Sequence, residues 1–308
     1  MLRVYIIIVN YIKWQDTLEC LESVFRSSYK NFSVIVIDND SKNDSLEHLA
    51  KWAASHSFKY VFFQKKDINN SFDPLSLPRL TFIQSDVNAG FAAGNNIALR
   101  LLQEQDAYFL LLNPDTIVQE DMLEEMTKFA AQRPSRAIIG ARILSLTGNR
   151  ELLFYGGATI NFMTSTITPT RKISVTPPLD YIHGACFFSH TSNLRMVGLL
   201  PEMYFLYWEE SDWCFRARQL GCEFHVCPSA ICYDKISTVI GRGFMADYFY
   251  VRNGLLFISK YRTKNLPFVL FFNVLRFFKR VFTGKWQKAS GVFKGTIDFF
   301  KMKGNEAK

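Results

Sequence analysis

Short apolar runs alternate with amphipathic stretches along the first third of the chain. The apolar runs are rich in β-branched or aromatic residues and are bounded by polar ones, which is typical of buried strands. They cover residues 4–9, 34–37, 58–63, 81–84 and 108–112. Between them, apolar residues recur at helical spacing and predict helices over residues 17–27, 45–55 and 94–103. The polar, proline-containing residues 65–78 predict a loop. Strands that alternate with helices predict an α/β fold, a mostly parallel sheet with helices on both faces.

Four of these predicted strands end in polar or glycine-rich segments. The segments are Asn10-Tyr11, DNDS at 38–41, NAGFAAGNN at 88–96 and NPDT at 113–116. Each one alone is explained by a turn or a helix cap. In a parallel sheet, however, the carboxyl ends of the strands share one edge, where α/β folds bind their ligands. Together the four segments therefore predict a ligand site at that edge.

A cluster of acidic residues lies between two tryptophans. Glu209, Glu210 and Asp212 fall within four positions and are flanked by Trp208 and Trp213. One interpretation is that the acids only stabilise the N-terminus of a helix, where negative charge is favoured. The other is that the aromatic rings partly desolvate a carboxylate and raise its pKa, which suits a general base.

The segments on either side of this cluster predict further elements. YIHGACFFSH at 181–190 predicts a strand in which Gly184 marks a close approach of the backbone. Residues 211–220 predict a helix with Ser211 as its N-cap and an ion pair between Asp212 and Arg216.

Length and composition limit the possible architectures. With 308 residues, 48% of them hydrophobic, the chain fits one large α/β domain with an appendage, or two domains. Its six cysteines form no CxxC pair and match no zinc pattern, which favours reduced thiols in a cytosolic core. The apolar run at 4–9 is too short for a secretory signal, so it is expected to be a strand.

The basic charge is concentrated at the C-terminal end. Residues 260–308 contain twelve basic and two acidic residues, whereas the whole chain has a net charge of +8. Between 266 and 303, Phe and Leu alternate with Lys and Arg at near-helical spacing, and the longest apolar run is too short to span a bilayer. This pattern suits a helix in an anionic membrane interface. The alternative is a helix packed on the catalytic domain or a dimer partner. Nucleic acid is not expected, because no binding module is recognisable.

Seven segments, taken in order, resemble the family-2 inverting glycosyltransferases of the GT-A fold. The resemblance is strongest to the rhamnosyltransferase-like branch, which builds bacterial surface polysaccharides. The segments span roughly residues 4–261 and read IIIVNY, VIDNDSKNDS, NAGFAAGNN, FLLLNPDTIV, HGACFF, YFLYWEESDWCFRARQLG and DYFYVRNGLLFISKY. The resemblance implies a GT-A catalytic domain over 1–240, with a nucleotide-sugar half at 1–118 and an acceptor half at 119–240. A C-terminal helical, membrane-interface segment would follow at 241–308.

The resemblance also implies roles for individual residues. A nucleotide-diphosphate sugar would be bound by Asn10, Asp38, Asn88, Gly90, Gly94, Asn95, Asn113 and Asp115. Mg²⁺ or Mn²⁺ would bind at Asp115 and Asp234 and neutralise the diphosphate. Glu210 would be the catalytic base, with Asp212 in the same catalytic motif. Gly184, Trp208 and Glu209 would lie on the acceptor side.

Three positions depart from the family pattern. Glu210 replaces the commoner aspartate, which keeps the chemistry but changes the reach. Asn113 stands where the family often has a carboxylate. Asp234 stands where the family usually has a metal-binding histidine, so it is either a metal ligand or, if the alignment slips, a surface turn residue.

The implied reaction moves a sugar, rhamnose or another hexose, from a dTDP- or UDP-linked donor to a hydroxyl of a glycan or polyprenyl-diphosphate-linked acceptor. It would serve O-antigen, capsule or cell-wall polysaccharide synthesis, on the cytoplasmic face of the membrane, with a homo-oligomer possible. A nucleotide-cofactor oxidoreductase is disfavoured because NYIKWQD, after the first strand, contains no glycine. A non-catalytic sugar-nucleotide binder remains an alternative, and it would bind the donor without transfer or hydrolysis.

Overall fold

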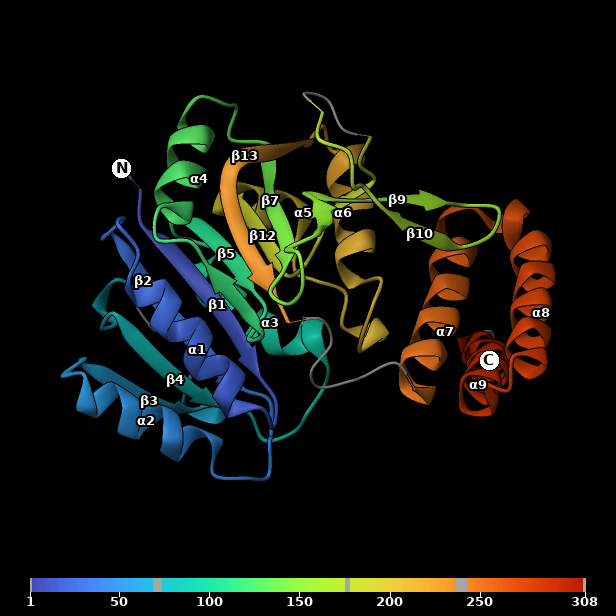
Figure 1. Cartoon of the computed structure of the whole chain (residues 1–308), viewed down its shortest axis with the longest axis horizontal. Coiled ribbons are helices and arrows are strands. Elements are labelled where there is room, and N and C mark those ends of the chain that lie inside the picture. The colour runs from blue at the N-terminus through green and yellow to red at the C-terminus, as the bar shows by residue number, and fades with distance from the viewer. Residues whose placement is uncertain (1, 69–73, 175–177, 236–242, 307–308) are drawn as a thin grey trace.

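The first half of the chain forms the parallel part of a large mixed sheet. The computed structural model describes residues 2–68, 74–174, 178–235 and 243–306. Its first strands stand in the order β3-β4-β2-β1-β5, all parallel (Figure 1). Their bounds are β1 Val4–Asn10, β2 Phe32–Asp38, β3 Tyr60–Gln64, β4 Leu80–Gln84 and β5 Tyr108–Leu112. The crossover helices are α1 Trp14–Phe25, α2 Ser45–Ser55 and α3 Phe91–Leu102.

Both faces of the sheet are buried, which explains the continuous apolar runs. In β1, Val4, Ile6 and Ile8 face one hydrophobic core, while Tyr5 and Ile7 face the other. The first core is covered by α1, α2 and α4 (Met122–Ala131). The second is covered by α3, α5 (Thr191–Val197), α6 (Glu209–Gln219) and α7 (Phe244–Tyr261). The predicted α/β class and the helices on both faces are confirmed.

The second half of the chain adds mostly antiparallel strands to the same sheet. Strand β12 (Cys186–His190) lies antiparallel between β5 and β7 (Ala137–Ser145). The long strand β13 (Glu223–Asp234) pairs parallel with β7 and antiparallel with the short β6 (Thr116–Val118). The sheet ends in β8 Leu152–Tyr155, β9 Gly157–Asn161 and β10 Thr166–Pro169, with β11 Tyr181–Ile182 on β9. The nucleotide-sugar and acceptor halves expected from the sequence therefore share one sheet.

Two local predictions are wrong. The expected single strand at 181–190 is two strands, β11 and β12, separated by a turn that contains Gly184. Ser211 is not an N-cap, because α6 already begins at Glu209 and Ser211 is buried inside it. The reason is Trp208, whose left-handed φ of 78° turns the chain into the helix two residues earlier. The loop expected at 65–78 contains two short 3-10 turns, and its residues 69–73 lie outside the described residues.

Three C-terminal helices pack together at one end of the molecule (Figure 1). They are α7, α8 (Leu266–Phe282) and α9 (Trp286–Glu306). Helix α7 joins them to the rest of the protein, since its residues Leu255 to Ile258 lie in the second hydrophobic core. Among the described residues, no helix combines the length and the apolar character that crossing a membrane requires.

Candidate functional site

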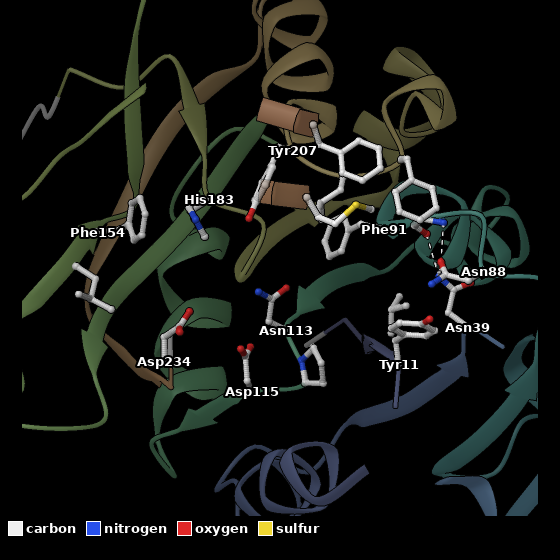
Figure 2. Close-up of a pocket in the computed structure, with 18 of the residues that line it drawn as sticks. Tyr11, Asn39, Asn88, Phe91, Asn113, Asp115, Phe154, His183, Tyr207 and Asp234 are labelled. Carbon is white, nitrogen blue, oxygen red and sulfur yellow. Dashed lines mark hydrogen bonds between the residues drawn. The ribbon is translucent and has the colours of Figure 1, made fainter. Parts of the chain in front are cut away.

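A cavity of about 700 Å³ opens at the carboxyl edge of the parallel strands (Figure 2). The residues that line it from the first half are Val9, Tyr11, Asn39, Asn88, Gly90, Phe91, Asn113, Pro114 and Asp115. The second half contributes Leu153, Phe154, Arg171, His183, Phe205, Leu206, Tyr207, Asp234, Met245 and Phe249. The predicted convergence of strand ends on one site is therefore confirmed, and this site also includes residues from the distant second half.

Five of the residues predicted for the site lie on its wall: Asn88, Gly90, Asn113, Asp115 and Asp234. The remaining predicted residues lie behind this wall or in the helices next to it. Their contacts indicate what each one does there.

Asp38 does not line the cavity but stabilises a loop that does. Its side chain is 2% exposed. One carboxylate oxygen accepts hydrogen bonds from Asn10 Nδ2 (2.7 Å) and Ser41 Oγ (2.7 Å), and the other from Gln84 Nε2 (3.0 Å). These bonds order the loop after β2, whose next residue, Asn39, faces the cavity.

Asn39 connects two strand-end loops. Its Nδ2 donates to Asn88 Oδ1 (2.9 Å) and to the Gly90 carbonyl (3.2 Å), as drawn in Figure 2. Gly90 has a φ of +94°, and a Cβ there would lie 2.2 Å from the carbonyl oxygen of Phe205, so only glycine fits.

Gly94 and Asn95 do not line the cavity. A Cβ on Gly94 would lie 2.8 Å from the Val9 side chain, which shows how closely α3 approaches β1. Asn95 Nδ2 donates to the Phe91 carbonyl within α3. Both residues therefore fix the helix whose first residue, Phe91, lines the cavity.

The two predicted metal ligands come together at the cavity floor (Figure 2). Asp234 pairs with Thr116 across β13 and β6, and the backbone N–H of Lys235 donates to the Asp115 carbonyl (3.1 Å). Asp115 and Asp234 are only 9% and 8% exposed. The alternative that Asp234 is a surface turn residue is therefore wrong.

The donor set at the floor fits a hard divalent cation. Mg²⁺ and Mn²⁺ prefer oxygen ligands, and Mg²⁺ is usually held by one or two carboxylates together with substrate phosphates. The described residues contain no group of three or more His, Cys, Asp or Glu that could hold a metal ion. An ion at Asp115 and Asp234 would thus take its remaining oxygen ligands from water or a bound ligand.

A loop with a strained backbone leads from the cavity wall to the acidic cluster. Phe205, Tyr207 and Trp208 have φ values of 66°, 63° and 78°, and each such conformation costs about 1–3 kcal/mol in a residue other than glycine. Helix α6 begins directly after them with Glu209 and Glu210.

Glu210 lies beside the cavity without being part of its wall. Its Oε2 has no hydrogen-bond partner among the described residues. A Cβ on Gly184 would lie 3.4 Å from Glu210 Oε1 and from the ring of Phe91, which lines the cavity. Burial raises the pKa of Glu210, whereas the nearby backbone N–H groups lower it. A raised pKa suits a general base, and Glu210, unlike Glu209, is partly exposed.

Glu209, Asp212 and Trp208 are deeply buried. Glu209 is 2% exposed, and its Oε2, like that of Glu210, has no hydrogen-bond partner among the described residues. Burial, followed by repulsion from Glu210, raises the pKa of Glu209 well above its ordinary value. Trp208 is 1% exposed, and its Nε1 donates to the Tyr250 carbonyl (3.0 Å).

Asp212 is fully buried, and both its oxygens are engaged. One oxygen pairs with Arg216 Nε (3.0 Å), which confirms the predicted ion pair. The other pairs with Lys260 Nζ (2.9 Å) and accepts from the Tyr204 hydroxyl (2.8 Å). Both oxygens are thus engaged by neighbouring side chains and Asp212 does not line the cavity, so the geometry favours a supporting role over proton transfer.

His183 is a site residue that the sequence analysis missed. Its ring packs on Phe154 with centroids 4.0 Å apart, and its Nδ1 accepts from the Ala185 N–H (3.1 Å). Burial lowers the pKa of His183 to about 4, so the ring is neutral at pH 7 and carries its proton on Nε2. The available signal was its position at the start of the segment HGACFF, next to Gly184. Arg171 and Met245, which also line the cavity, lie outside the recognised segments, and Met245 is two residues before one of them.

Comparisons with known proteins agree with this architecture. The family described as Glycosyl transferase family 2 matches residues 5–194. The chain is similar to the low-salt glycan biosynthesis hexosyltransferase Agl10 of Haloferax volcanii, with 27% identity over 72% of this chain and 64% of that protein. It is also similar to the rhamnosyltransferase WbbL of Escherichia coli, with 26% identity over 73% of this chain and 81% of that protein. The chain thus spans slightly less than two thirds of the archaeal relative.

A solved structure supports the fold. The mannosyltransferase PcManGT from Pyrobaculum calidifontis, in complex with GDP-Man and Mn²⁺, matches with a TM-score of 0.59 at 13% identity. The match covers 97% of this chain and 87% of that chain, so the GT-A fold expected from the sequence is confirmed. Because the family match covers more than half of its residues, the chain belongs to glycosyl transferase family 2.

Proposed function

We propose that the chain is a metal-dependent, inverting glycosyltransferase that uses a nucleotide-diphosphate sugar. The observation that carries this proposal is the pair Asp115 and Asp234 on the floor of a cavity whose wall also contains Asn39, Asn88 and Gly90. A nucleoside diphosphate needs a neutralising cation next to a surface that contacts its base and ribose. One cavity offers both.

The donor and acceptor are proposed from the relatives. Similarity to a rhamnosyltransferase and a hexosyltransferase supports transfer of rhamnose or another hexose. The donor would be dTDP- or UDP-linked, and the acceptor would be a hydroxyl of a glycan or lipid-linked glycan. The product would belong to O-antigen, capsule or cell-wall polysaccharide synthesis.

Glu210 would accept the proton of the acceptor hydroxyl as that oxygen attacks the anomeric carbon. Its raised pKa and partial exposure support this role. A divalent cation held by Asp115 and Asp234 would stabilise negative charge on the departing diphosphate. Asp212 would hold α6 through Arg216 and Lys260.

Inversion follows from having one acceptor-activating base and no covalent intermediate. Glu209, the nearest second acid, is only 2% exposed, whereas Glu210 is partly exposed. Glu209 is therefore unsuited to attack the sugar, and Trp208 and Gly184 would instead shape the acceptor side around Glu210.

A donor panel tests this function. Purified protein is mixed with dTDP-, UDP- and GDP-sugars and candidate acceptors, and release of nucleoside diphosphate is measured with Mg²⁺ or Mn²⁺ against EDTA. We expect release with one donor only when metal is present, and an inverted anomeric configuration in the product by NMR.

Glu210→Gln is expected to abolish transfer while nucleotide affinity stays close to that of the unchanged protein. The reason is that Glu210 lies outside the strand-end loops that would contact the nucleotide. Unchanged turnover in this variant would remove Glu210 from the mechanism. Donor binding without transfer or hydrolysis under any condition would instead support the non-catalytic binder.

The C-terminal helices are proposed to hold the enzyme on the anionic inner face of the cell membrane. Helix α8 exposes a row of large apolar side chains, and residues 260–308 are strongly basic. Membrane attachment of this kind would bring the cavity to a lipid-linked acceptor.

A further inference from the structure

A strained loop between Tyr204 and Trp208, here named the 204–208 loop, joins the cavity to helix α6. Three of its residues, Phe205, Tyr207 and Trp208, have left-handed φ values although none is glycine. L-amino acids rarely adopt this conformation unless contacts from outside the segment impose it. The backbone conformation of the 204–208 loop therefore depends on contacts with residues outside the loop.

The main external contact is a single buried side chain on α7. Asn253 is fully buried. Its Nδ2 lies within hydrogen-bond distance of three loop carbonyls, at 2.8 Å from Tyr204, 2.6 Å from Leu206 and 3.1 Å from Tyr207. The two N–H groups of this amide are thus shared among three carbonyls of the loop.

Two neighbours of Asn253 reinforce this contact. Arg252 donates from Nη2 to the Tyr204 carbonyl (2.7 Å) and from Nε to Asn253 Oδ1 (2.9 Å), which orients the amide. The Tyr250 carbonyl accepts from Trp208 Nε1 (3.0 Å). One turn of α7 therefore holds both ends of the loop.

The 204–208 loop contributes to the cavity wall, contacts α3 and leads directly into α6. Phe205, Leu206 and Tyr207 line the cavity (Figure 2). The Phe205 carbonyl accepts from the Phe91 N–H (2.8 Å), at the start of α3. Glu210 follows two residues after Trp208, so the path of the loop sets where its carboxylate stands.

We propose that Asn253 is a positioning residue, which fixes Glu210 against the cavity through the 204–208 loop. The inference rests on the proposed role of Glu210 as the base. It also gives the C-terminal helices a part in the reaction, because α7 connects them to the loop.

The test compares two variants in the same helix. Asn253→Ala removes the donors to the loop. Val251→Ala removes methyl groups from a buried α7 residue that, being aliphatic, cannot bond to the loop carbonyls. We expect Asn253→Ala to lower kcat by about tenfold or more, because misplacing a reacting group is costly. The KM for the donor and the Kd of the nucleoside diphosphate should change by less than about threefold, since the strand-end loops are untouched. Val251→Ala should lower the Tm and leave kcat unchanged.

A second readout does not need activity. Loss of the hydrogen bonds from Asn253 should expose Phe205 and Tyr207 to chymotrypsin. Mass spectrometry should therefore find cleavage there earlier in Asn253→Ala than in Val251→Ala. If Asn253→Ala does not fold, Arg252→Met gives a milder test, with a smaller loss of kcat and faster cleavage at the same two residues.

The positioning role of Asn253 and the role of Glu210 as the base are refuted by different results. Equal loss of kcat in Asn253→Ala and Val251→Ala, or equal cleavage of the loop, would show general destabilisation and refute the positioning role. Unchanged turnover in Glu210→Gln would refute the proposed base, while the cleavage pattern would still decide whether Asn253 holds the loop.

Discussion

Asp115 and Asp234 show how the site depends on single side chains. They belong to segments far apart in the chain and meet only because β6 pairs with β13. The spacing of the two carboxylates is thus set by backbone hydrogen bonds.

For Asp115→Asn we expect turnover to fall about 100-fold or more, because one of the two anionic ligands proposed for the cation is lost. The measurement is kcat during a Mn²⁺ titration. Asp121→Asn, at an exposed aspartate before α4, is the matched control and should behave like the unchanged protein. An Asp115→Asn variant with the original Mn²⁺ dependence would place the cation elsewhere.

Glu209 should make stability depend on pH. Its pKa in the folded protein is raised well above the ordinary value by burial and, secondarily, by the neighbouring Glu210. The folded state then binds the proton more tightly than the unfolded state, so its contribution to stability is full below the ordinary pKa of about 4.5. That contribution is lost as pH rises through the raised pKa.

Glu209→Gln removes this loss, because the amide of glutamine does not titrate. We expect the variant to exceed the unchanged protein in unfolding free energy by about 1 kcal/mol or more at pH 8. The difference should shrink towards pH 5, as followed by urea unfolding at several pH values. Glu104→Gln, at an exposed position, should show no such trend. A pH-independent difference for Glu209→Gln would contradict the assigned cause.

At the scale of elements, two glycines of α9 allow this helix to pack closely against α7. A Cβ on Gly291 would lie 2.6 Å from the Phe244 carbonyl oxygen, and one on Gly295 would lie 2.6 Å from that of Tyr248. Because these are backbone atoms, the helices would have to move apart to admit a methyl group.

We therefore expect Gly291→Ala and Gly295→Ala each to cost about 1–3 kcal/mol of stability. Gly304→Ala is the matched control in the same helix, since no atom lies within 4 Å of its Cβ position. Its higher helix propensity should leave stability unchanged or raise it by up to about 1 kcal/mol. Thermal unfolding of the three variants measures this. Equal behaviour of all three would mean that the tight α7–α9 contact is absent in solution.

Local patterns predicted elements where local forces decide them. The ranges 45–55 and 108–112 agree with α2 and β5 at both ends, because helical spacing and a short continuous apolar run mark buried faces directly. The start of α6 could not be predicted, since the left-handed Trp208 is held by α7, which lies far along the chain. The same limit applies to Arg171, which lines the cavity without belonging to a segment whose pattern indicates a ligand, and to the ring of His183, which reaches the cavity wall through the turn between β11 and β12.

At the scale of the whole molecule, the C-terminal helices present an unusual surface. Helix α8 buries Val269 and Asn273 but exposes a row at helical spacing, here named the α8 apolar face. It consists of Phe268, Phe271, Phe272, Leu275, Phe278 and Phe282, which are 38–83% exposed. A water-facing surface of this kind is unfavourable unless a partner covers it. Exposed basic residues accompany it, since Lys264 lies just before α8 and Lys279 lies within it.

An anionic membrane would match both the α8 apolar face and the basic charge of residues 260–308. The unchanged protein should float with vesicles of equal parts phosphatidylglycerol and phosphatidylcholine at low salt, and less with phosphatidylcholine alone. The double variant Phe271→Glu, Phe278→Glu should bind about tenfold more weakly or worse, because it places charge in the acyl region. Leu75→Glu with Leu220→Glu changes the net charge equally, at exposed apolar positions outside the C-terminal helices, and should float normally. Failure of the unchanged protein to float would exclude the membrane, and equal flotation of both double variants would show that charge acts without the α8 apolar face.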